Sequence, residues 1–306
     1  MFSPLFSTKP MESSQYRDRF KTGRFYLKLF LRGLGDPRRL LSRGRTYLWS
    51  RTAEGFIVSY PKTGRTWLRV MLGKAVSLKY DLDDRLILDT LRLTRRAGLS
   101  PTVFSHDGPF LLQNTASYHD LKFNTGLYRH KKVIFLVRDI RDTLVSSYFQ
   151  QSKRTKVEKF NLGDFIRDER FGARKIVTFY NLWFTHREVP KDFLLIRYEE
   201  MHSKPTEVLR SVMAFLNSGE VEQVVLDAAV SYGSFNHMRN MEEKNAFGDS
   251  MLRPGTENDN DSYKVRRGKI GGFVDYFTKE DLGYVDEVVL KMGLKGCDWY
   301  YALEPH

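Results

Sequence analysis

Cysteine is almost absent from this 306-residue sequence, in which Cys297 is the only one. A single cysteine excludes an intramolecular disulfide, and nothing in its use suggests an oxidising compartment. The sequence also lacks a thiol cluster, a His-Glu-x-x-His pattern and a set of carboxylates with metal-ligand spacing, so we expect no metal site. Internal repeats and low-complexity tracts are missing as well. These absences favour one compact domain of ordinary composition.

Long apolar runs are missing too. The apolar stretch near Phe25–Leu34 is too short and too charged to span a bilayer, and it does not have the form of a secretory signal. We therefore predict a cytoplasmic protein without a transmembrane segment. Basic and apolar residues alternate over 1–50, which predicts a basic amphipathic helical extension ahead of a single domain over 51–306. Such a helix usually packs on its own domain, and peripheral contact with an anionic membrane is the other interpretation.

Acidic residues are too few to balance the basic ones: 37 Asp and Glu stand against 50 Lys and Arg, a net charge of +13. Such an excess is often a sign of nucleic-acid binding, but no recognised nucleic-acid module is present, and we predict no nucleic-acid partner. A small anionic ligand explains part of the charge.

Apolar runs of strand length occur near 56–60, at 102–106, at 133–137 and from 193 onward, and helical patterns separate or follow them at 67–76, 164–188, 206–216, 220–230 and 279–292. This alternation predicts an α/β fold, with an open, mainly parallel, P-loop-like sheet flanked by helices on both faces. The segment 242–265 is polar and has few apolar anchors, so we expect it to be a mobile lid.

The segment 56–67 has the pattern of a strand, a tight turn and the start of a helix. Its sequence is Phe-Ile-Val-Ser-Tyr-Pro-Lys-Thr-Gly-Arg-Thr-Trp. Such a turn directs backbone N–H groups and the positive end of the helix dipole at an anion, and Lys62, Thr63 and Thr66 add side-chain donors. The nucleotide P-loop, G-x-x-x-x-G-K-[ST], has its lysine after the second glycine. Here Lys62 precedes Gly64, so the sequence predicts an anion loop of a different kind and disfavours an ATP-dependent kinase.

Two further residues follow predicted strands. Arg138 comes directly after the run at 133–137, and Ser146 lies eight residues later. A guanidinium and a hydroxyl placed in this way could clamp a phosphate, although an arginine at a strand end is by itself more often a surface ion pair. His106 ends the run from Thr102; its near-neutral pKa suits a general base, although a lone histidine is usually structural. Lys62, His106, Arg138 and Tyr198, which follows the run from 193, all fall at or just past the carboxyl ends of predicted strands, where open parallel sheets bind ligands.

These motifs resemble those of the sulfotransferases that use 3′-phosphoadenosine 5′-phosphosulfate (PAPS). Tyr60-Pro61-Lys62-Thr63-Gly64-x-Thr66-Trp67 resembles the family's 5′-phosphosulfate loop, and Arg138 with Ser146 resembles its 3′-phosphate signature. The resemblance implies PAPS as co-substrate, 3′-phosphoadenosine 5′-phosphate (PAP) as product, and no metal. By the same resemblance, the residues implied to bind the cofactor are Lys62, Thr63, Gly64, Arg65, Thr66, Trp67, Arg138, Ser146, Tyr198, Phe235, Arg266, Arg267 and Gly268.

The resemblance also implies a mechanism, in which an acceptor hydroxyl or amine attacks sulfur in line. His106 would remove the acceptor proton, and Lys62 would neutralise the charge that develops on the leaving oxygen. The acceptor itself stays open among small molecules, lipids and glycans, and an oligomer is compatible with the sequence. The alternative is a catalytically silent protein of the same fold that binds membrane surfaces or polyanions.

Three positions depart from the family pattern. Arg65 stands where the family usually has Thr or Ser, and Gly233 replaces a hydroxyl residue before Ser234-Phe235. Gly271-Gly272-Phe273-Val274 replaces the family's Gly-Asp-Trp-Lys, so contacts made by that Trp or Lys are lost or replaced.

Overall fold

A computed structural model of the chain describes residues 51–107, 117–155, 161–248, 252, 256 and 259–296. The basic extension predicted over 1–50 lies outside these residues, and its contact with a membrane stays a prediction. Within the described ranges, no helix is both long enough and apolar enough to cross a bilayer. The same residues contain no cluster of three or more potential metal ligands.

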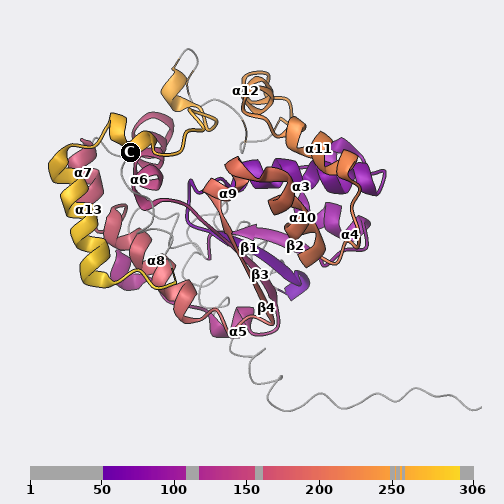
Figure 1. The fold of residues 1–306 in the computed structure, drawn as a ribbon, viewed down its shortest axis with the longest axis horizontal. Coiled ribbons are helices and arrows are strands. Elements are labelled where there is room, and N and C mark those ends of the chain that lie inside the picture. Colours follow the sequence, from indigo (N-terminus) through magenta and orange to yellow (C-terminus); the bar gives the residue numbers. More distant parts are fainter. Residues whose placement is uncertain are drawn as a thin grey trace, which may run out of the picture.

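The described residues form a four-stranded parallel sheet with the order β2-β1-β3-β4 (Figure 1). Its strands are β1 (Gly55–Ser59), β2 (Thr102–Ser105), β3 (Lys132–Val137) and β4 (Asp192–Arg197). In the centre, Phe56 lies opposite Val103 on one side and Val133 on the other. All five residues of β1 are buried, as expected of a parallel strand that is covered on both faces. The predicted α/β fold is confirmed.

Helices cover the two faces of the sheet in two groups, which Figure 1 shows on either side of the strands. Side chains alternate along β1, so Ile57 packs into one apolar cluster while Phe56 and Val58 pack into the other. The Ile57 side is covered by α3 (Arg65–Lys79), α4 (Thr90–Arg96), α10 (Pro205–Phe215) and α11 (Gln223–Tyr232). The opposite side is covered by α6 (Ile140–Phe149), α7 (Leu162–Arg167), α8 (Ala173–Thr185) and α13 (Lys279–Met292).

Shorter elements connect these layers. They are α5 (Thr125–Tyr128), α9 (Tyr198–Ser203), α12 (Phe235–Glu243), the π-helical turn η4 (Gln150–Thr155) and the 3₁₀ turns η1 (Asp84–Leu86), η3 (Tyr118–Asp120), η6 (Asn260–Ser262) and η7 (Gly272–Asp275). The helix expected over 164–188 is divided into α7 and α8. The Asp168 carboxylate accepts a hydrogen bond from the backbone N–H of Arg170 at 2.7 Å, a local bond that replaces the helical one at the break.

The segment predicted as a lid, 242–265, is described only in part. Its described residues include three that are fully buried, Glu242, Leu252 and Ser262. Leu252 joins a small apolar cluster with Val70 and Met241. The described parts are therefore anchored at separate points, and closure of the segment over a ligand stays a proposal.

Candidate active site

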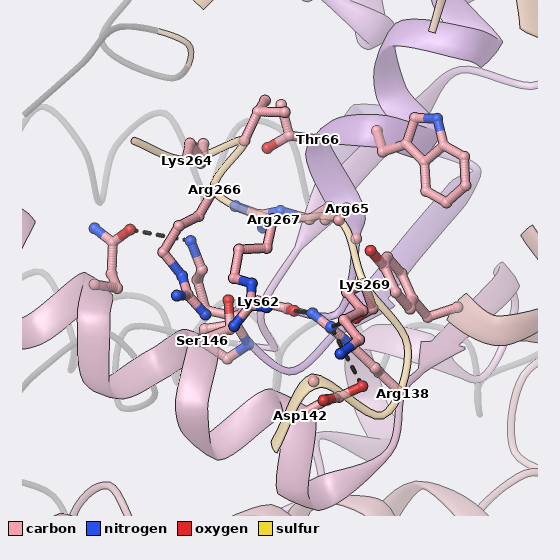
Figure 2. Close-up of a pocket in the computed structure, with 18 of the residues that line it drawn as sticks. Lys62, Arg65, Thr66, Arg138, Asp142, Ser146, Lys264, Arg266, Arg267 and Lys269 are labelled. Atoms are coloured by element: carbon pink, nitrogen blue, oxygen red, sulfur yellow. Dashed lines mark hydrogen bonds and ion pairs between the residues drawn. The ribbon is translucent and has the colours of Figure 1, made fainter. Parts of the chain in front are cut away.

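A cavity of about 580 Å³ opens at the carboxyl edge of the sheet (Figure 2). Its walls come from the β1–α3 turn, the end of β2, α6, α9, α12 and the turn at 264–272, segments that are far apart in the sequence. The structure brings most of the predicted site residues together here: Lys62, Gly64, Arg65, Thr66, Trp67, His106, Arg138, Ser146, Tyr198, Phe235, Arg266, Arg267 and Gly268 all line this cavity.

The β1–α3 turn holds its shape through backbone conformations that few residues adopt. Lys62 has a φ of 72° and Gly64 a φ of 94°, both left-handed. A Cβ atom on Gly64 would lie 2.5 Å from Cδ2 of Tyr198, so only glycine lets the turn approach that ring. Thr63 is fully buried and its Oγ1 donates to the carbonyl oxygen of Tyr60 at 2.9 Å. The Thr63 side chain therefore closes the turn and, unlike its neighbours, is not part of the cavity wall.

Positive charge is concentrated on this cavity, as the labelled lysines and arginines of Figure 2 show. The Lys62 ammonium donates to Oε1 of Gln150 at 3.2 Å. Burial and the guanidinium of Arg154 lower the pKa of Lys62 to about 7. Burial and the ammonium of Lys62 likewise lower the pKa of Lys264 to about 7. Buried cations that repel one another are stabilised by an anion between them, so the arrangement suits a phosphate or sulfate group.

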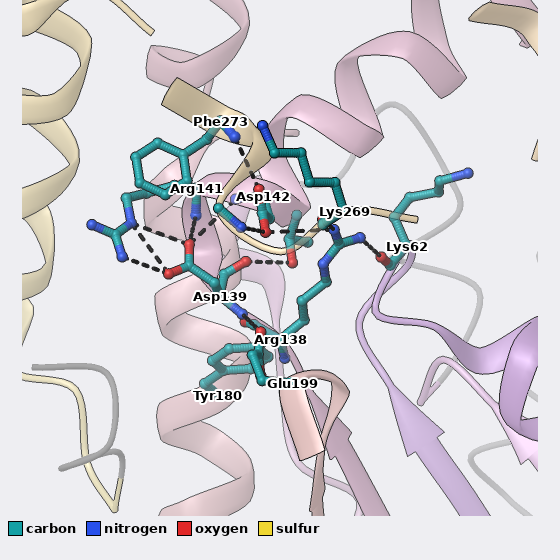
Figure 3. A network of polar contacts seen from close by, with 11 residues as sticks. Lys62, Arg138, Asp139, Arg141, Asp142, Tyr180, Glu199, Lys269 and Phe273 are labelled. Carbon is teal, nitrogen blue, oxygen red and sulfur yellow. Dashed lines mark hydrogen bonds and ion pairs between the residues drawn. The ribbon is translucent and has the colours of Figure 1, made fainter. Parts of the chain in front are cut away.

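Arg138 connects three of the segments that form the cavity (Figure 3). One Nη donates to the carbonyl oxygen of Lys62 at 3.2 Å and the other to that of Lys269 at 3.1 Å. The guanidinium lies 4.1 Å from the centroid of the Tyr198 ring. The backbone of Arg138 is fixed by the hydroxyl of Tyr180, which donates to its carbonyl at 2.9 Å. Arg138 lines the cavity, is 8% exposed, and has no hydrogen-bond partner for its Nε among the described residues.

Asp142, which sequence reasoning missed, attaches the last turn to α6 (Figure 3). Its carboxylate accepts hydrogen bonds from the N–H of Gly271 at 2.9 Å and from that of Phe273 at 3.0 Å. Asp139 begins α6 by accepting from the N–H of Arg141 at 2.7 Å, a cap that an aspartate before a helix predicts. The Phe273 ring lies 4.2 Å from the Arg141 guanidinium. The departure Gly271-Gly272-Phe273 is thus accommodated by packing and backbone bonds to α6.

Glu242, also missed, holds the start of the turn that carries Arg266 to Gly268. Its buried carboxylate accepts from the N–H of Lys264 at 2.7 Å and of Val265 at 2.8 Å, and it pairs with Arg154 at 3.1 Å. Further along, Gly268 has a φ of 59°, and a Cβ there would lie 2.7 Å from Cδ2 of Phe235. The turn therefore rests directly on the Phe235 ring.

Aromatic rings form another part of the wall. Trp67 and Tyr198 pack edge to face with centroids 5.7 Å apart, and His202, which sequence reasoning did not select, lies 4.7 Å from Trp67. Phe235 is 42% exposed, although large apolar side chains are usually buried. Exposed and half-buried rings at a cavity suit a planar heterocycle such as a nucleobase.

His106 has a neutral ring that suits a general base. Its Nδ1 lies 2.8 Å from the carbonyl oxygen of Ser59. A carbonyl oxygen only accepts, so Nδ1 carries the hydrogen and Nε2 has a free lone pair. Burial and the charges of Arg65 and Arg69 hold the pKa of His106 well below 6.5. The ring is therefore neutral at physiological pH and able to take a proton. The adjacent Asp107 is not part of the cavity wall and accepts a hydrogen bond from the Tyr128 hydroxyl at 2.7 Å.

Comparison with known proteins gives consistent results. The family model described as "Sulfotransferase domain" matches residues 53–296. Sulfotransferase 2A6 of Rattus norvegicus is 28% identical over 249 residues, covering 76% of this chain and 81% of the relative. Cytosolic sulfotransferase 17 of Arabidopsis thaliana is 24% identical over 283 residues, covering 86% of this chain and 79% of the relative. The crystal structure of mouse sulfotransferase SULT7A1 complexed with PAP is similar in fold, with a TM-score of 0.56 and 21% identity over 82% of this chain and 88% of that one.

Proposed function

This chain belongs to the sulfotransferase-domain family, and we propose that it transfers the sulfonate group of PAPS to a hydroxyl or amine of a small-molecule acceptor, releasing PAP. Membership makes it a PAPS-dependent sulfotransferase. The observation that carries the detailed proposal is the cavity, which is lined by Lys62, by the neutral His106 and by several other cations. Its volume of about 580 Å³ is in the range of small-ligand sites. The name of the Arabidopsis relative supports a cytosolic location.

The residues present fit PAPS. The cofactor supplies a sulfonate that is activated by its bond to a phosphate, and a second phosphate on the ribose. We assign the phosphosulfate to Lys62, Thr66 and the N–H groups at the start of α3. We assign the 3′-phosphate to Arg138, to Ser146 and to the turn at 266–268, which all line the cavity. Trp67, Tyr198 and Phe235 remain for the adenine.

Two side chains then perform the chemistry. The free Nε2 of His106 accepts the proton of the acceptor as the acceptor oxygen or nitrogen bonds to sulfur. The Lys62 ammonium stabilises the oxygen that leaves with PAP, where negative charge grows as the S–O bond breaks. This interaction is stronger in the transition state than in the ground state, so it accelerates the reaction. An anion beside Lys62 raises its pKa again from about 7 and keeps it charged.

The test is transfer of label from sulfur-labelled PAPS to two pools of acceptors, one of small hydroxylated compounds and amines and one of polysaccharides. We expect label in the small-molecule pool and none with His106→Ala, which should still bind PAP. Label in the polysaccharide pool alone would contradict the small-molecule acceptor. Equal transfer by His106→Ala would refute the role of the base.

A further inference from the structure

We propose that the acceptor carries a negative charge, such as a carboxylate, phosphate or sulfate ester, close to its reacting group, and that Arg65 binds this charge. The inference rests on the proposed function, because it places the acceptor beside His106. It deepens that function by assigning a chemical class to the acceptor and a specificity-determining role to Arg65.

The order of the strands divides the cavity into a donor side and an acceptor side. His106 follows β2, Lys62 follows β1 and Arg138 follows β3, and the sheet order is β2-β1-β3. The carboxyl edge therefore presents His106, then Lys62, then Arg138. With the 3′-phosphate over Arg138 and the phosphosulfate over Lys62, the acceptor lies on the β2 side, at the edge of the sheet.

Arg65 belongs to the β2 side. It is the first residue of α3, and Arg69 is one turn later on the same face of the helix. The Arg69 guanidinium lies over the ring of Phe104 in β2, 4.4 Å from its centroid, and Arg69 is only 6% exposed. The face that carries both arginines is thus directed at β2. After burial, the charge of Arg65 is the largest influence that lowers the pKa of His106, so its guanidinium lies near the base.

A neutral acceptor would leave this half-buried guanidinium without a counter-charge. Among the described residues no carboxylate forms an ion pair with Arg65, and burial, followed by the charge of Arg69, lowers its pKa. Desolvated like charges are costly unless an anion joins them. The phosphosulfate already meets Lys62 and the N–H groups of the turn, whereas Arg65 lines the cavity with no anion assigned to it.

The test measures binding of two phenols of the same shape to the PAP-saturated enzyme, 2-hydroxyphenylacetate and the neutral 2-hydroxyphenylacetamide, in which the side chain is adjacent to the hydroxyl. Calorimetry compares the wild type with Arg65→Thr, which removes the charge, and Arg65→Lys, which keeps it. Arg92→Thr is the matched control, because it removes one exposed arginine on α4, away from the cavity wall. Transfer from labelled PAPS to the same phenols repeats the comparison with the sulfonate in place.

We expect the wild type and Arg92→Thr to bind the acid about 10- to 100-fold more tightly than the amide, the range of one charge-assisted hydrogen bond. Arg65→Thr should reduce this ratio to about threefold or less while PAP affinity changes little, and Arg65→Lys should keep part of it. An acid that binds no more tightly than the amide, including binding of neither, overturns the inference. A loss of PAP affinity in Arg65→Thr as large as the loss for the acid assigns Arg65 to the donor instead. A wild type that does not bind PAP refutes the proposed function itself.

Discussion

The buried carboxylate of Glu242 is expected to determine whether the turn at 264–268 can close the nucleotide site. It is fully buried and accepts two backbone N–H groups of that turn, at 2.7 and 2.8 Å, while it neutralises Arg154. Glu242→Gln keeps the shape but leaves one oxygen to accept, so one N–H of the turn then faces an NH₂ group. The ion pair between Glu242 and Arg154 is also lost, close to Lys62, whose pKa the charge of Arg154 already lowers.

The size of the effect follows from these contacts. A hydrogen bond to a charged group contributes about 1.5–3 kcal/mol, and removing one partner of a buried ion pair costs about 3–5 kcal/mol. Because glutamine retains part of the bonding, we expect a loss of about 3 kcal/mol. For a chain of 306 residues that is a fall of about 5 °C in Tm. Ordering of the loosened turn is then required on binding, so PAP affinity should fall about 10- to 100-fold.

Calorimetric titration with PAP and thermal unfolding measure the two effects. Glu243→Gln is the matched control, because the neighbouring carboxylate pairs with Arg239 at 3.0 Å while its side chain is 49% exposed. An exposed pair of this kind contributes at most about 1 kcal/mol. A Glu242→Gln protein with lowered Tm but with the PAP affinity of the control would show that Glu242 stabilises the core without positioning the turn.

Three other predictions test the same site. Lys62→Ala should lower kcat by about 10²- to 10³-fold with little loss of PAP affinity. Arg138→Ala should mainly raise the Kd for PAP. If calorimetry shows that both substitutions weaken PAP binding equally, these roles are contradicted. In a proton NMR titration of the free enzyme, His106 should titrate below 6.5. Arg65→Thr should raise the pKa of His106, since burial and then the charge of Arg65 are the main causes that lower it. An unchanged pKa in the variant would show that the Arg65 charge does not act on His106. At pH 8 the free enzyme has Lys62 and Lys264 largely neutral, because the pKa of each is about 7. A bound anion raises both pKa values, so PAP binding should take up protons and should weaken as the pH rises above 7. Binding enthalpies that do not depend on the ionisation heat of the buffer would refute this.

The fold was predictable because its two central strands, β1 and β3, are buried on both faces. Val133 to Val137 forms an unbroken apolar run, and the same holds at Phe56 to Val58, so each stands out from the helical patterns around it. The division of 164–188 was not predictable from apolar spacing, which continues through the break. The bond from Arg170 to the Asp168 side chain, and not a loss of apolar residues, ends α7 there.

The anion-binding residues were accessible to sequence reasoning because they lie within short motifs at strand ends. Thr63 shows the limit of that reasoning, since a hydroxyl in such a turn can face the ligand or close the turn, and here it donates to Tyr60. Asp142 and Glu242 could not be found at all. Their partners, Gly271 and Lys264, are 129 and 22 residues away, and no periodicity connects positions that meet only through the tertiary fold.

The charged groups of the site therefore have two different functions. The buried carboxylates of Asp142 and Glu242 accept backbone N–H groups, and they hold the last turn against α6 and α12. Arg138 belongs partly with them, because its two Nη atoms donate to the carbonyl oxygens of Lys62 and Lys269. Lys62 makes one hydrogen bond to another segment, from its ammonium to Oε1 of Gln150, and no ion pair joins Arg65 to a described carboxylate. The two residues also differ in the strand that they lie beside. Nucleotide affinity should therefore depend mainly on the bridging residues, and the rate and acceptor choice mainly on Lys62 and Arg65.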